Sequence, residues 1–502
     1  MHANLSAALA DSFQRYAERI ALQTPTGERF TYAQVAQQVA RYKAVLNGAG
    51  AIKGDRVAVQ VEKSPRSLFL YLACLRAGVV YVPLNTAYQP AELGYFLQDA
   101  EPALIIVSVE AEASTRALVM SLNSKARVLT LSADGGSFGA DSTAPGEIKA
   151  ADIEPDDLAV IIYTSGTTGR SKGAMLTHRN LLSNALVLIE AWAISADDAI
   201  VHALPIFHVH GLFVANHCAL LSGAKLLWHA GFDTSAVMDD LQHATVMMGV
   251  PTFYTRLLAQ STFTKARCKN IRLFISGSAP LLLETFEQFR ARIGQTILER
   301  YGMSEAGMIA SNPLRGERRG GTVGFPLAGV ALRVADASEH AIADGESGAI
   351  QIRGDNVFAG YWRNPEKTRE EFTDDGWFRT GDIGVFDADG YLSIVGRAKD
   401  LIITGGYNVY PKEIELVLDA IPGVHESAVV GVPHPDFGEA VTAVIVMDGT
   451  RSHVEEAAVI AHLKTCLANY KVPKRVYFVT ELPRNAMGKV QKNVVREQVS
   501  QR

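Results

Sequence analysis

The sequence predicts an α/β protein with a large N-terminal domain of helix-covered, mostly parallel sheets, a smaller β unit and a small α+β domain at the C-terminal end. Two observations predict this class. Short β-branched runs alternate with amphipathic helical runs in the first half, and after about residue 330 the runs become shorter and alternate polar with apolar residues. The composition agrees: 502 residues, 48% hydrophobic and 20% charged, suit a large buried core and exclude disorder, collagen or a coiled coil for the whole chain.

The first half contains strand-like runs separated by helical stretches, which predicts parallel sheets covered by helices. One helix is marked at both ends, because Ser64 and Pro65 are typical of a helix start and Gly78 is typical of a helix end. The strand-like runs are 56–61, 103–109, 158–164, 245–251 and 271–277.

The later part predicts a more antiparallel unit, from the alternating runs 331–336 and 349–354. Asp389 and Gly390 lie between two strand-like runs and indicate a hairpin. A βα pattern follows, with a helix opened by Pro411. We therefore predict two domains, 1–398 and 399–502, which meet at Lys399.

Charge and cysteine content exclude several classes. A formal net charge of −5 argues against a protein built to bind nucleic acid. The 4 cysteines are scattered without a CxxC, so neither a disulfide framework nor a zinc site is expected, and a reducing cytoplasm fits best. The N-terminus does not resemble a secretory signal. Residues 199–224 lack charged side chains but contain Pro205, Gly211 and four histidines, so we expect a buried core segment and no membrane span.

The clearest motif is TSGTTGRSKG, residues 164–173, directly after an apolar strand. Glycines let backbone N–H groups approach phosphate oxygens, hydroxyls add donors, and a lysine adds charge. The spacing is not that of a Walker loop, and no GxGxxG occurs. A plain Gly/Ser/Thr turn is the alternative; the hydroxyls and the lysine favour a phosphate-binding loop formed by Thr164, Ser165, Gly166, Thr167, Thr168, Gly169 and Lys172.

Six further segments accompany this loop, and their order carries a resemblance. They are ALPIFHVHGL (203–212), ISGSAPL (275–281), ERYGMSE (299–305), RTGDIG (379–384), VGRAKDLIITGGYNVYPKEIE (395–415) and LPRNAMGKV (482–490). Together they resemble the adenylate-forming superfamily of acyl-CoA synthetases, luciferases and peptide-synthetase adenylation domains over nearly the whole chain. The stretches HALPIFHVHGLF, MGVPTFYTRLL and LPRNAMGKVQKNV look like the malonyl-CoA synthetases in particular.

The resemblance implies a nucleotide site in which a carboxylate attacks the α-phosphorus of ATP and a thiol then displaces AMP. Cations and N–H donors must shield the charge when an anion meets a polyanion. Thr164 and Glu305 would hold Mg²⁺, Asp382 would bind the ribose, and Arg397 the ribose or a phosphate. The implied nucleotide contacts also include Ser278, Ala279, Pro280, Glu299, Arg300, Tyr301, Gly302, Met303 and Ser304.

Each implied role has a plain structural alternative. Glu305 could be a helix N-terminal carboxylate, Asp382 a turn residue and Tyr301 a core residue. Arg397 could form a surface ion pair. Lys489, which the resemblance places between the attacking carboxylate and the α-phosphate, could be a solvated lysine in a basic tail.

The resemblance places His208 beside the reacting carboxylate, with Val209, His210 and Met303 around the acyl group; the alternative for both histidines is packing in the core. Arg256 decides the substrate in this interpretation, because a buried arginine suits a second carboxylate by forked hydrogen bonds. The alternative for Arg256 is a side chain that points to solvent.

The resemblance also implies a mobile C-terminal domain with Lys399 as its hinge, which presents Lys489 for adenylation and then Gly405, Gly406 and Tyr407 to the pantetheine arm of CoA. The alternative for the two glycines is a simple turn. The PxxxxGK context of Lys489 resembles that of acetylated relatives, so we expect a protein acetyltransferase to act on this lysine.

The leading hypothesis is therefore an ATP-, Mg²⁺- and coenzyme A-dependent ligase that makes malonyl-CoA and releases AMP and pyrophosphate. The alternatives are methylmalonate, acetate, propionate or another short acid, a carrier-protein pantetheine arm as acceptor, or a catalytically silent nucleotide-binding module. No nucleic acid partner is expected.

Overall fold

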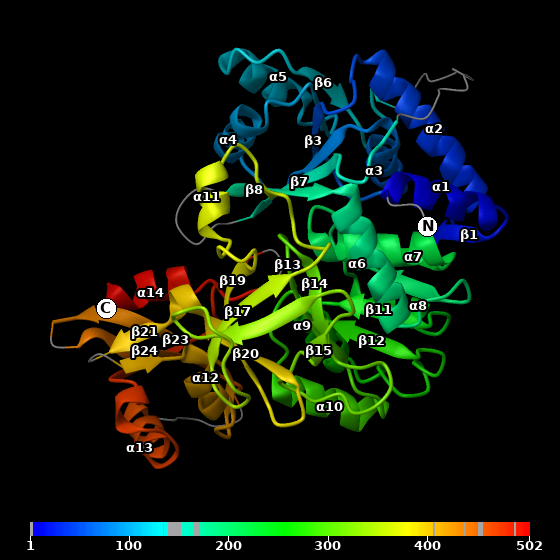
Figure 1. Cartoon of the computed structure of the whole chain (residues 1–502). Coiled ribbons are helices and arrows are strands. Elements are labelled where there is room, and N and C mark those ends of the chain that lie inside the picture. The colour runs from blue at the N-terminus through cyan, green and yellow to red at the C-terminus, as the bar shows by residue number, and fades with distance from the viewer. Residues whose placement is uncertain are drawn as a thin grey trace.

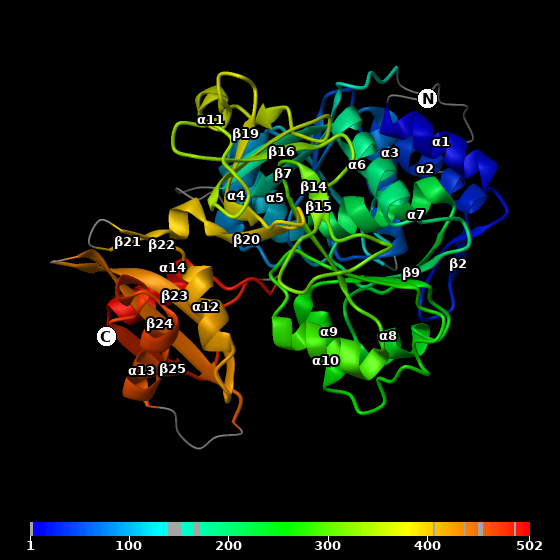
Figure 2. The ribbon, with the colours of Figure 1, turned by 60° about the horizontal axis from the view of Figure 1, so that its bottom comes forward.

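The computed structural model describes residues 4–133, 135–138, 152–164, 171–404, 407–435, 437–449, 455–485 and 488–501. It has the predicted α/β architecture. Two large mixed sheets lie next to each other with helices on their faces, and the C-terminal segment forms a separate sheet at one side of both (Figures 1 and 2). A small antiparallel sheet lies between these parts along the chain.

The first large sheet is parallel except at one edge, where β8 and β18 are antiparallel. Its order is β18 (Gly360–Tyr361), β8 (Lys172–Thr177), β7 (Leu158–Thr164), β4 (Val80–Pro83), β3 (Arg56–Gln60), β5 (Leu104–Val107) and β6 (Arg127–Thr130). Strands such as Leu104–Val107 are buried along their whole length, as parallel strands covered on both faces must be.

The second large sheet has a parallel centre with antiparallel strands at both edges. Its order is β15 (Phe325–Pro326), β14 (Gly307–Ser311), β13 (Leu298–Met303), β12 (Leu273–Ser276), β11 (Val246–Gly249), β9 (Ala199–His202), β10 (Lys225–Trp228), β1 (Ile20–Gln23) and β2 (Arg29–Thr31). The loops that follow β9, β12 and β13 carry the predicted site motifs.

Helices cover both sheets. The helix expected after Ser64 is α3, where the Ser64 side chain accepts from Ser67 N–H and Gly78 ends the helix at φ 69°. The helices of this part are α1 (Leu5–Arg15), α2 (Tyr32–Gly48), α3 (Pro65–Ala77), α4 (Pro90–Ala100), α5 (Glu112–Ser121), α6 (His178–Ala191), α7 (Asn216–Ser222), α8 (Thr234–Asp240), α9 (Pro251–Leu258), α10 (Leu283–Ile293) and α11 (Pro365–Glu370).

The small antiparallel sheet confirms the predicted hairpin. Its order is β16 (Ala331–Ala335), β17 (Gly348–Arg353), β19 (Phe378–Phe386) and β20 (Leu392–Arg397). The turn between the last two strands contains Asp389 and Gly390, whose φ is 82°. The same pairing sets Asp382 opposite Arg397, so two predicted site residues are neighbours by strand register alone.

The C-terminal segment has its own sheet and its own apolar core. Its strands are β21 (Ile402–Thr404), β22 (Tyr407–Val409), β23 (Val424–His434), β24 (Gly438–Met447) and β25 (Arg475–Val479). Its helical elements, with the short turn η2 before it, are η2 (Ala398–Asp400), α12 (Pro411–Asp419), α13 (Glu456–Cys466), η3 (Asn469–Lys471) and α14 (Lys492–Ser500). The helix opened by Pro411 is confirmed.

The uncharged segment 199–224 is mostly buried, as predicted. Its proline, glycine and histidines were the reason to expect a core segment and no membrane span. It is divided into β9, the π-helical turn η1 (His210–Ala215) and α7. In the part of the chain that the structure describes, no helix is long and apolar enough to cross a bilayer.

Candidate active site

The candidate site lies where the carboxyl end of β7 meets the loop after β13. Thr164 ends β7 in the first sheet, and its Oγ1 donates to Oε1 of Glu305 at 3.3 Å. Tyr361, in β18, donates its hydroxyl to the same oxygen at 3.2 Å. Loops at the carboxyl ends of parallel strands are where α/β proteins bind their ligands.

Glu305 is a buried carboxylate that could act as a hard oxygen ligand. The residue is buried, and burial raises the pKa of its carboxyl group above the ordinary value. A nearby cation would favour the ionised form again. Carboxylate and hydroxyl oxygens are the donors that Mg²⁺ prefers, so Glu305 and Thr164 fit the predicted metal.

Asp382 is held between an aromatic hydroxyl and a guanidinium. Tyr301 donates its hydroxyl to Oδ2 of Asp382 at 2.5 Å, and Nε of Arg397 lies 2.7 Å from Oδ1. Tyr301 and Asp382 are both buried. The structure therefore brings together three residues that are predicted to bind the nucleoside, from β13, β19 and β20.

The loop predicted to bind phosphates is described at its two ends. Lys172 is partly buried, with its Nζ 5.5 Å from the ring centre of Tyr361. Because Tyr361 also contacts Glu305, the Lys172 ammonium lies on the same side of the site as Glu305. Ser165, Gly166, Thr167, Thr168 and Gly169 lie outside the described residues, so their role stays a prediction.

The loop after β12 contains a strained residue beside a histidine. Ser278 has a φ of 72°, which is uncommon for a residue other than glycine and tends to occur at functional sites. Its Oγ lies 3.3 Å from Nδ1 of His210. Ala279 and Pro280 continue the same loop, and N–H of Leu281 is fixed by Oε1 of Glu299 at 3.2 Å.

Arg300 is the buried cation of the site. It lies in β13 with 4% of its surface exposed, and within the described chain its Nε and Nη2 have no hydrogen-bond partner. Gly277 leaves the room for it, because a Cβ at that glycine would lie 2.4 Å from the Arg300 Cζ. Burial lowers the pKa of Arg300 to about 9, so the guanidinium is still charged at pH 7.

His208 and His210 lie near this guanidinium and are neutral at pH 7. Burial lowers the pKa of His208 to about 4, with further lowering by the charges of Arg300 and Lys489. Burial, followed by Arg300, also lowers the pKa of His210 well below its ordinary value. Among the described residues, neither Nδ1 of His208 nor Nε2 of His210 has a hydrogen-bond partner.

Arg256 is not buried in this structure, and its contact with a second carboxylate stays a prediction. Arg256 is exposed on α9, whose buried face is formed by Phe253, Tyr254, Leu257 and Leu258. Because those four positions share one side of the helix, Arg256 faces solvent. The buried arginine of the site is Arg300, which the resemblance had placed among the nucleotide contacts.

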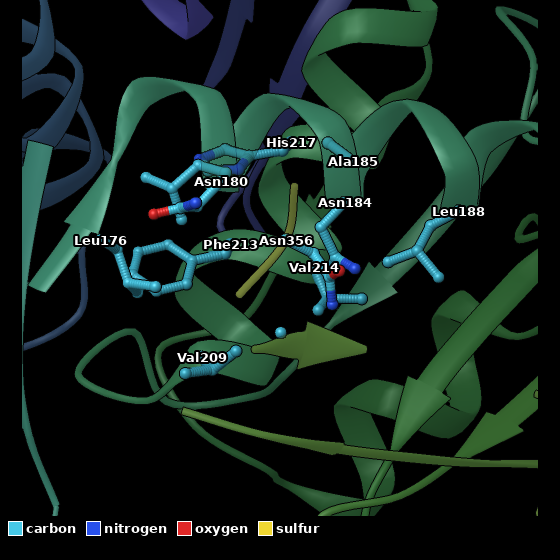
Figure 3. A pocket seen from close by; sticks show the side chains of 12 residues that line it. Leu176, Asn180, Asn184, Ala185, Leu188, Val209, Phe213, Val214, His217 and Asn356 are labelled. Atoms are coloured by element: carbon cyan, nitrogen blue, oxygen red, sulfur yellow. The ribbon is translucent and has the colours of Figure 1, made fainter. Parts of the chain in front are cut away.

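Val209 lines a small cavity beneath α6, with room for about one water molecule. Figure 3 shows Val209 on one side of this cavity and Asn180 and Asn184 on the other. An acyl group would not fit there. Met303, at the end of β13, is partly buried against the main core. The contacts of both residues with substrate stay predictions.

Lys489 is directed at the site from the C-terminal segment. Its loop contacts the start of α9, where a Cβ on Gly488 would lie 3.1 Å from Cγ2 of Thr252. Surrounding protein, followed by the charge of Arg397, lowers the pKa of Lys489 to about 8. The residue as a whole remains exposed.

The predicted hinge and CoA residues lie on the surface. Lys399 is exposed in η2, directly after β20. Tyr407 is 58% exposed, and its ring is stacked on that of Tyr470 with centroids 4.6 Å apart. Gly405 and Gly406 lie outside the described residues.

One contribution was missed in the sequence. Tyr361, which contacts both Glu305 and the Lys172 ammonium, lies in a two-residue strand without a motif of its own. Arg300 was predicted as a nucleotide contact because it stands in the ERYGMSE motif, and that contact stays a prediction. Its burial and its two nitrogens without partners among the described residues come from the structure.

Comparison with known proteins agrees with this fold. Residues 9–362 match the AMP-binding enzyme family, and residues 413–489 match the AMP-binding enzyme C-terminal domain. The chain therefore belongs to the AMP-binding enzyme family. The predicted boundary at Lys399 falls between the two matches and stays a prediction.

Particular members are similar over nearly the whole chain. ATP-bound MatB from Rhodopseudomonas palustris is 50% identical with a TM-score of 0.95, over 100% of this chain and 99% of that one. Its apo structure gives a TM-score of 0.85. A mitochondrial malonate–CoA ligase of Mus musculus is 36% identical over 527 residues, 96% of this chain and 89% of that protein. A feruloyl-CoA synthase of Amycolatopsis sp is 37% identical over 482 residues, 94% of each.

Proposed function

We propose that the protein ligates malonate to coenzyme A through a malonyl-adenylate, with release of AMP and pyrophosphate. The observation that carries the proposal is the buried Arg300 guanidinium, which has two N–H-bearing nitrogens without partners near His208 and His210. The similarity to MatB and to a malonate–CoA ligase supports the same substrate.

An unpaired buried charge is costly, so a site that keeps one is built for a ligand of opposite charge. The second carboxylate of malonate supplies that charge and can accept the forked hydrogen bonds of a guanidinium. A monocarboxylate such as acetate leaves Arg300 unpaired. Ferulate, the acid in the name of one relative, would set an aromatic group against the same cation without an anionic partner.

In the first half-reaction, the reacting carboxylate lies beside His208 and attacks the α-phosphorus of ATP. Asp382 accepts from the ribose hydroxyls, with its orientation fixed by Tyr301 and Arg397. Lys489 shields the negative charge that builds between the carboxylate and the α-phosphate. Glu305 and Thr164 would hold Mg²⁺, which would neutralise charge on the phosphate oxygens.

The conformation described here fits this first half-reaction. Lys489 is near Arg397 and His208, and the match to ATP-bound MatB is higher than the match to its apo form. For the second half-reaction, we propose that the C-terminal domain rotates about Lys399. Gly405, Gly406 and the exposed Tyr407 then face the pantetheine arm, whose thiol attacks the adenylate carbonyl and expels AMP.

Two further proposals concern the cell. We place the protein in the cytoplasm, which agrees with buried, unpaired Cys74, Cys218 and Cys268. We also propose that a protein acetyltransferase modifies Lys489, whose exposed position gives an enzyme access. Acetylation would remove the charge on which adenylation depends.

A substrate panel tests the proposal. Purified protein with Mg-ATP and CoA is offered acetate, propionate, malonate, methylmalonate, succinate, octanoate or 4-coumarate, while AMP and the CoA thioester are measured by mass. Malonate well ahead of acetate is the expected result. A faster monocarboxylate would overturn the assignment of Arg300 to a second carboxylate, and the absence of AMP with every acid would overturn the ligase.

A further inference from the structure

Lys63 is a buried lysine that joins the two large sheets. It follows β3 of the first sheet and is 8% exposed. Its Nζ lies 2.9 Å from Nδ1 and 2.8 Å from the carbonyl oxygen of His202, which ends β9 of the second sheet. The same Nζ is 4.4 Å from the ring centre of Trp228, at the end of β10.

The hydrogen bonds of His202 determine which ring nitrogen carries the proton. Its Nε2 lies 2.9 Å from the carbonyl oxygen of Gly211. A carbonyl only accepts, so Nε2 must be the donor and Nδ1 the acceptor from Lys63. Burial, with the nearby Lys63, lowers the pKa of His202 well below its ordinary value, which keeps the ring neutral with one proton.

Gly211 is part of the backbone turn that carries the site histidines. It directly follows His210 in η1, and the N–H of Leu212 donates to the carbonyl oxygen of His208 at 2.9 Å. The turn has little freedom, since a Cβ at Gly211 would lie 2.2 Å from the carbonyl oxygen of Pro205. Movement of the Gly211 carbonyl therefore moves His208 and His210.

We propose that Lys63 and His202 are positioning residues for adenylate formation. Lys63 donates to Nδ1 of His202, which places the proton on Nε2, and that proton holds the Gly211 carbonyl and the histidine turn in place. Neither residue contacts substrate. This inference rests on the proposed function, since it assumes that His208 lies beside the reacting carboxylate.

A hollow beside Lys63 makes a sharp test possible. It is lined by Lys63 and mostly apolar neighbours such as Tyr81, Leu84, Pro205 and Phe207. A small alkylamine can reach the space that Lys63→Ala leaves. Propylammonium replaces the three methylenes and the ammonium that this substitution removes, whereas propionitrile has the same number of non-hydrogen atoms but no hydrogen-bond donor.

The experiment compares Lys63→Ala with the wild type in malonate-dependent pyrophosphate exchange. Misplaced groups typically cost up to about 100-fold, so we expect kcat to fall roughly 10- to 100-fold with an unchanged KM for ATP. Propylammonium should restore much of the rate and propionitrile, which has no donor, should restore little. The matched control is Lys43→Ala, another buried lysine, on α2, which should not respond to the amine. An unchanged kcat, or equal rescue by the amine and the nitrile, would overturn the proposal.

Two further measurements distinguish a failure of this proposal from a failure of the proposed function and from a folding defect. The ring ¹⁵N shifts of His202 report, without any substrate, whether Nδ1 accepts a hydrogen bond, and Lys63→Ala should move the Nδ1 shift to that of an acceptor without a donor. If the Nδ1 shift does not change, the positioning role is refuted even if malonate is the substrate. His202→Gln can still accept from Lys63 and donate to Gly211, so it should keep most of the rate, whereas His202→Leu should lose it. Equal rates for these two variants would also refute the role.

Discussion

The most informative perturbation is Arg300→Met, which removes the buried guanidinium but keeps a long apolar side chain. In the described structure, Nε and Nη2 of Arg300 have no hydrogen-bond partner. Truncating one member of a buried, hydrogen-bonded charge pair typically costs about 2–5 kcal/mol. The kcat/KM for malonate should therefore fall roughly 30- to 5,000-fold.

The effect on acetate and on stability should be different. Acetate has no second carboxylate, so its kcat/KM should change by less than about tenfold. The unliganded protein should melt at the same temperature or higher, because the substitution removes an unpaired charge from the interior. Malonate should raise the melting temperature of the wild type and have no effect on that of the variant.

Arg256→Met is the matched control, because it makes the same change at an exposed arginine. The assay is thioester formation, by mass, with malonate and acetate in parallel. An equal loss for both acids in Arg300→Met would refute the assignment of the second carboxylate to Arg300, and a malonate-specific loss in Arg256→Met would assign a contact with that carboxylate to Arg256.

Three further predictions follow from the site. Lys489→Ala should abolish adenylate formation but spare thioester formation from supplied malonyl-adenylate, and an equal loss of both half-reactions would contradict the hinge. The wild-type kcat/KM for adenylation should fall as the pH rises past about 8, because the lysine loses its proton there. Tyr301→Phe removes the donor to Asp382 and should raise the KM for ATP roughly tenfold, measured by pyrophosphate exchange, with the KM for malonate unchanged. Burial raises the pKa of Glu299 to about 7. The folded state therefore holds more protons than the unfolded state between about pH 4.5 and 7. As the pH rises through that window, the contribution of Glu299 to the free energy of unfolding falls by about 3 kcal/mol. Glu299→Gln should remove that fall and melt higher than the wild type at pH 8; the reverse order in calorimetry would show that Glu299 is charged and stabilised in the folded state.

Much of the fold could be predicted from local sequence. The strand 158–164 and the helix between Ser64 and Gly78 depend on apolar runs, caps and a positive φ, which are local properties. The hairpin at Asp389 and Gly390 then fixed the register that sets Asp382 opposite Arg397. The placement of these two residues in the candidate site therefore depends on neighbouring strands alone.

Which of the two arginines, Arg256 or Arg300, is buried in the site was harder to predict from the sequence. The apolar positions 253, 254, 257 and 258 place Arg256 on the outer face of α9, so its exposure was available from helical spacing. The resemblance to the malonyl-CoA synthetases led instead to the prediction that Arg256 contacts the substrate. Arg300 lies in a strand buried on both faces, where alternation along the sequence gives no sign of which cavity a side chain reaches.

The sequence by itself determined the class of protein, because the loop at 164–173 and the order of the later motifs are linear features. Only the tertiary structure decided which charges are left without partners and which side chains meet across sheets. The Arg300 side chain has room because Gly277, 23 positions earlier, has no side chain of its own, and Lys63 meets His202 because two sheets pack with their strand ends together. Burial and long-range contact depend on how whole layers pack, and no local pattern encodes that packing.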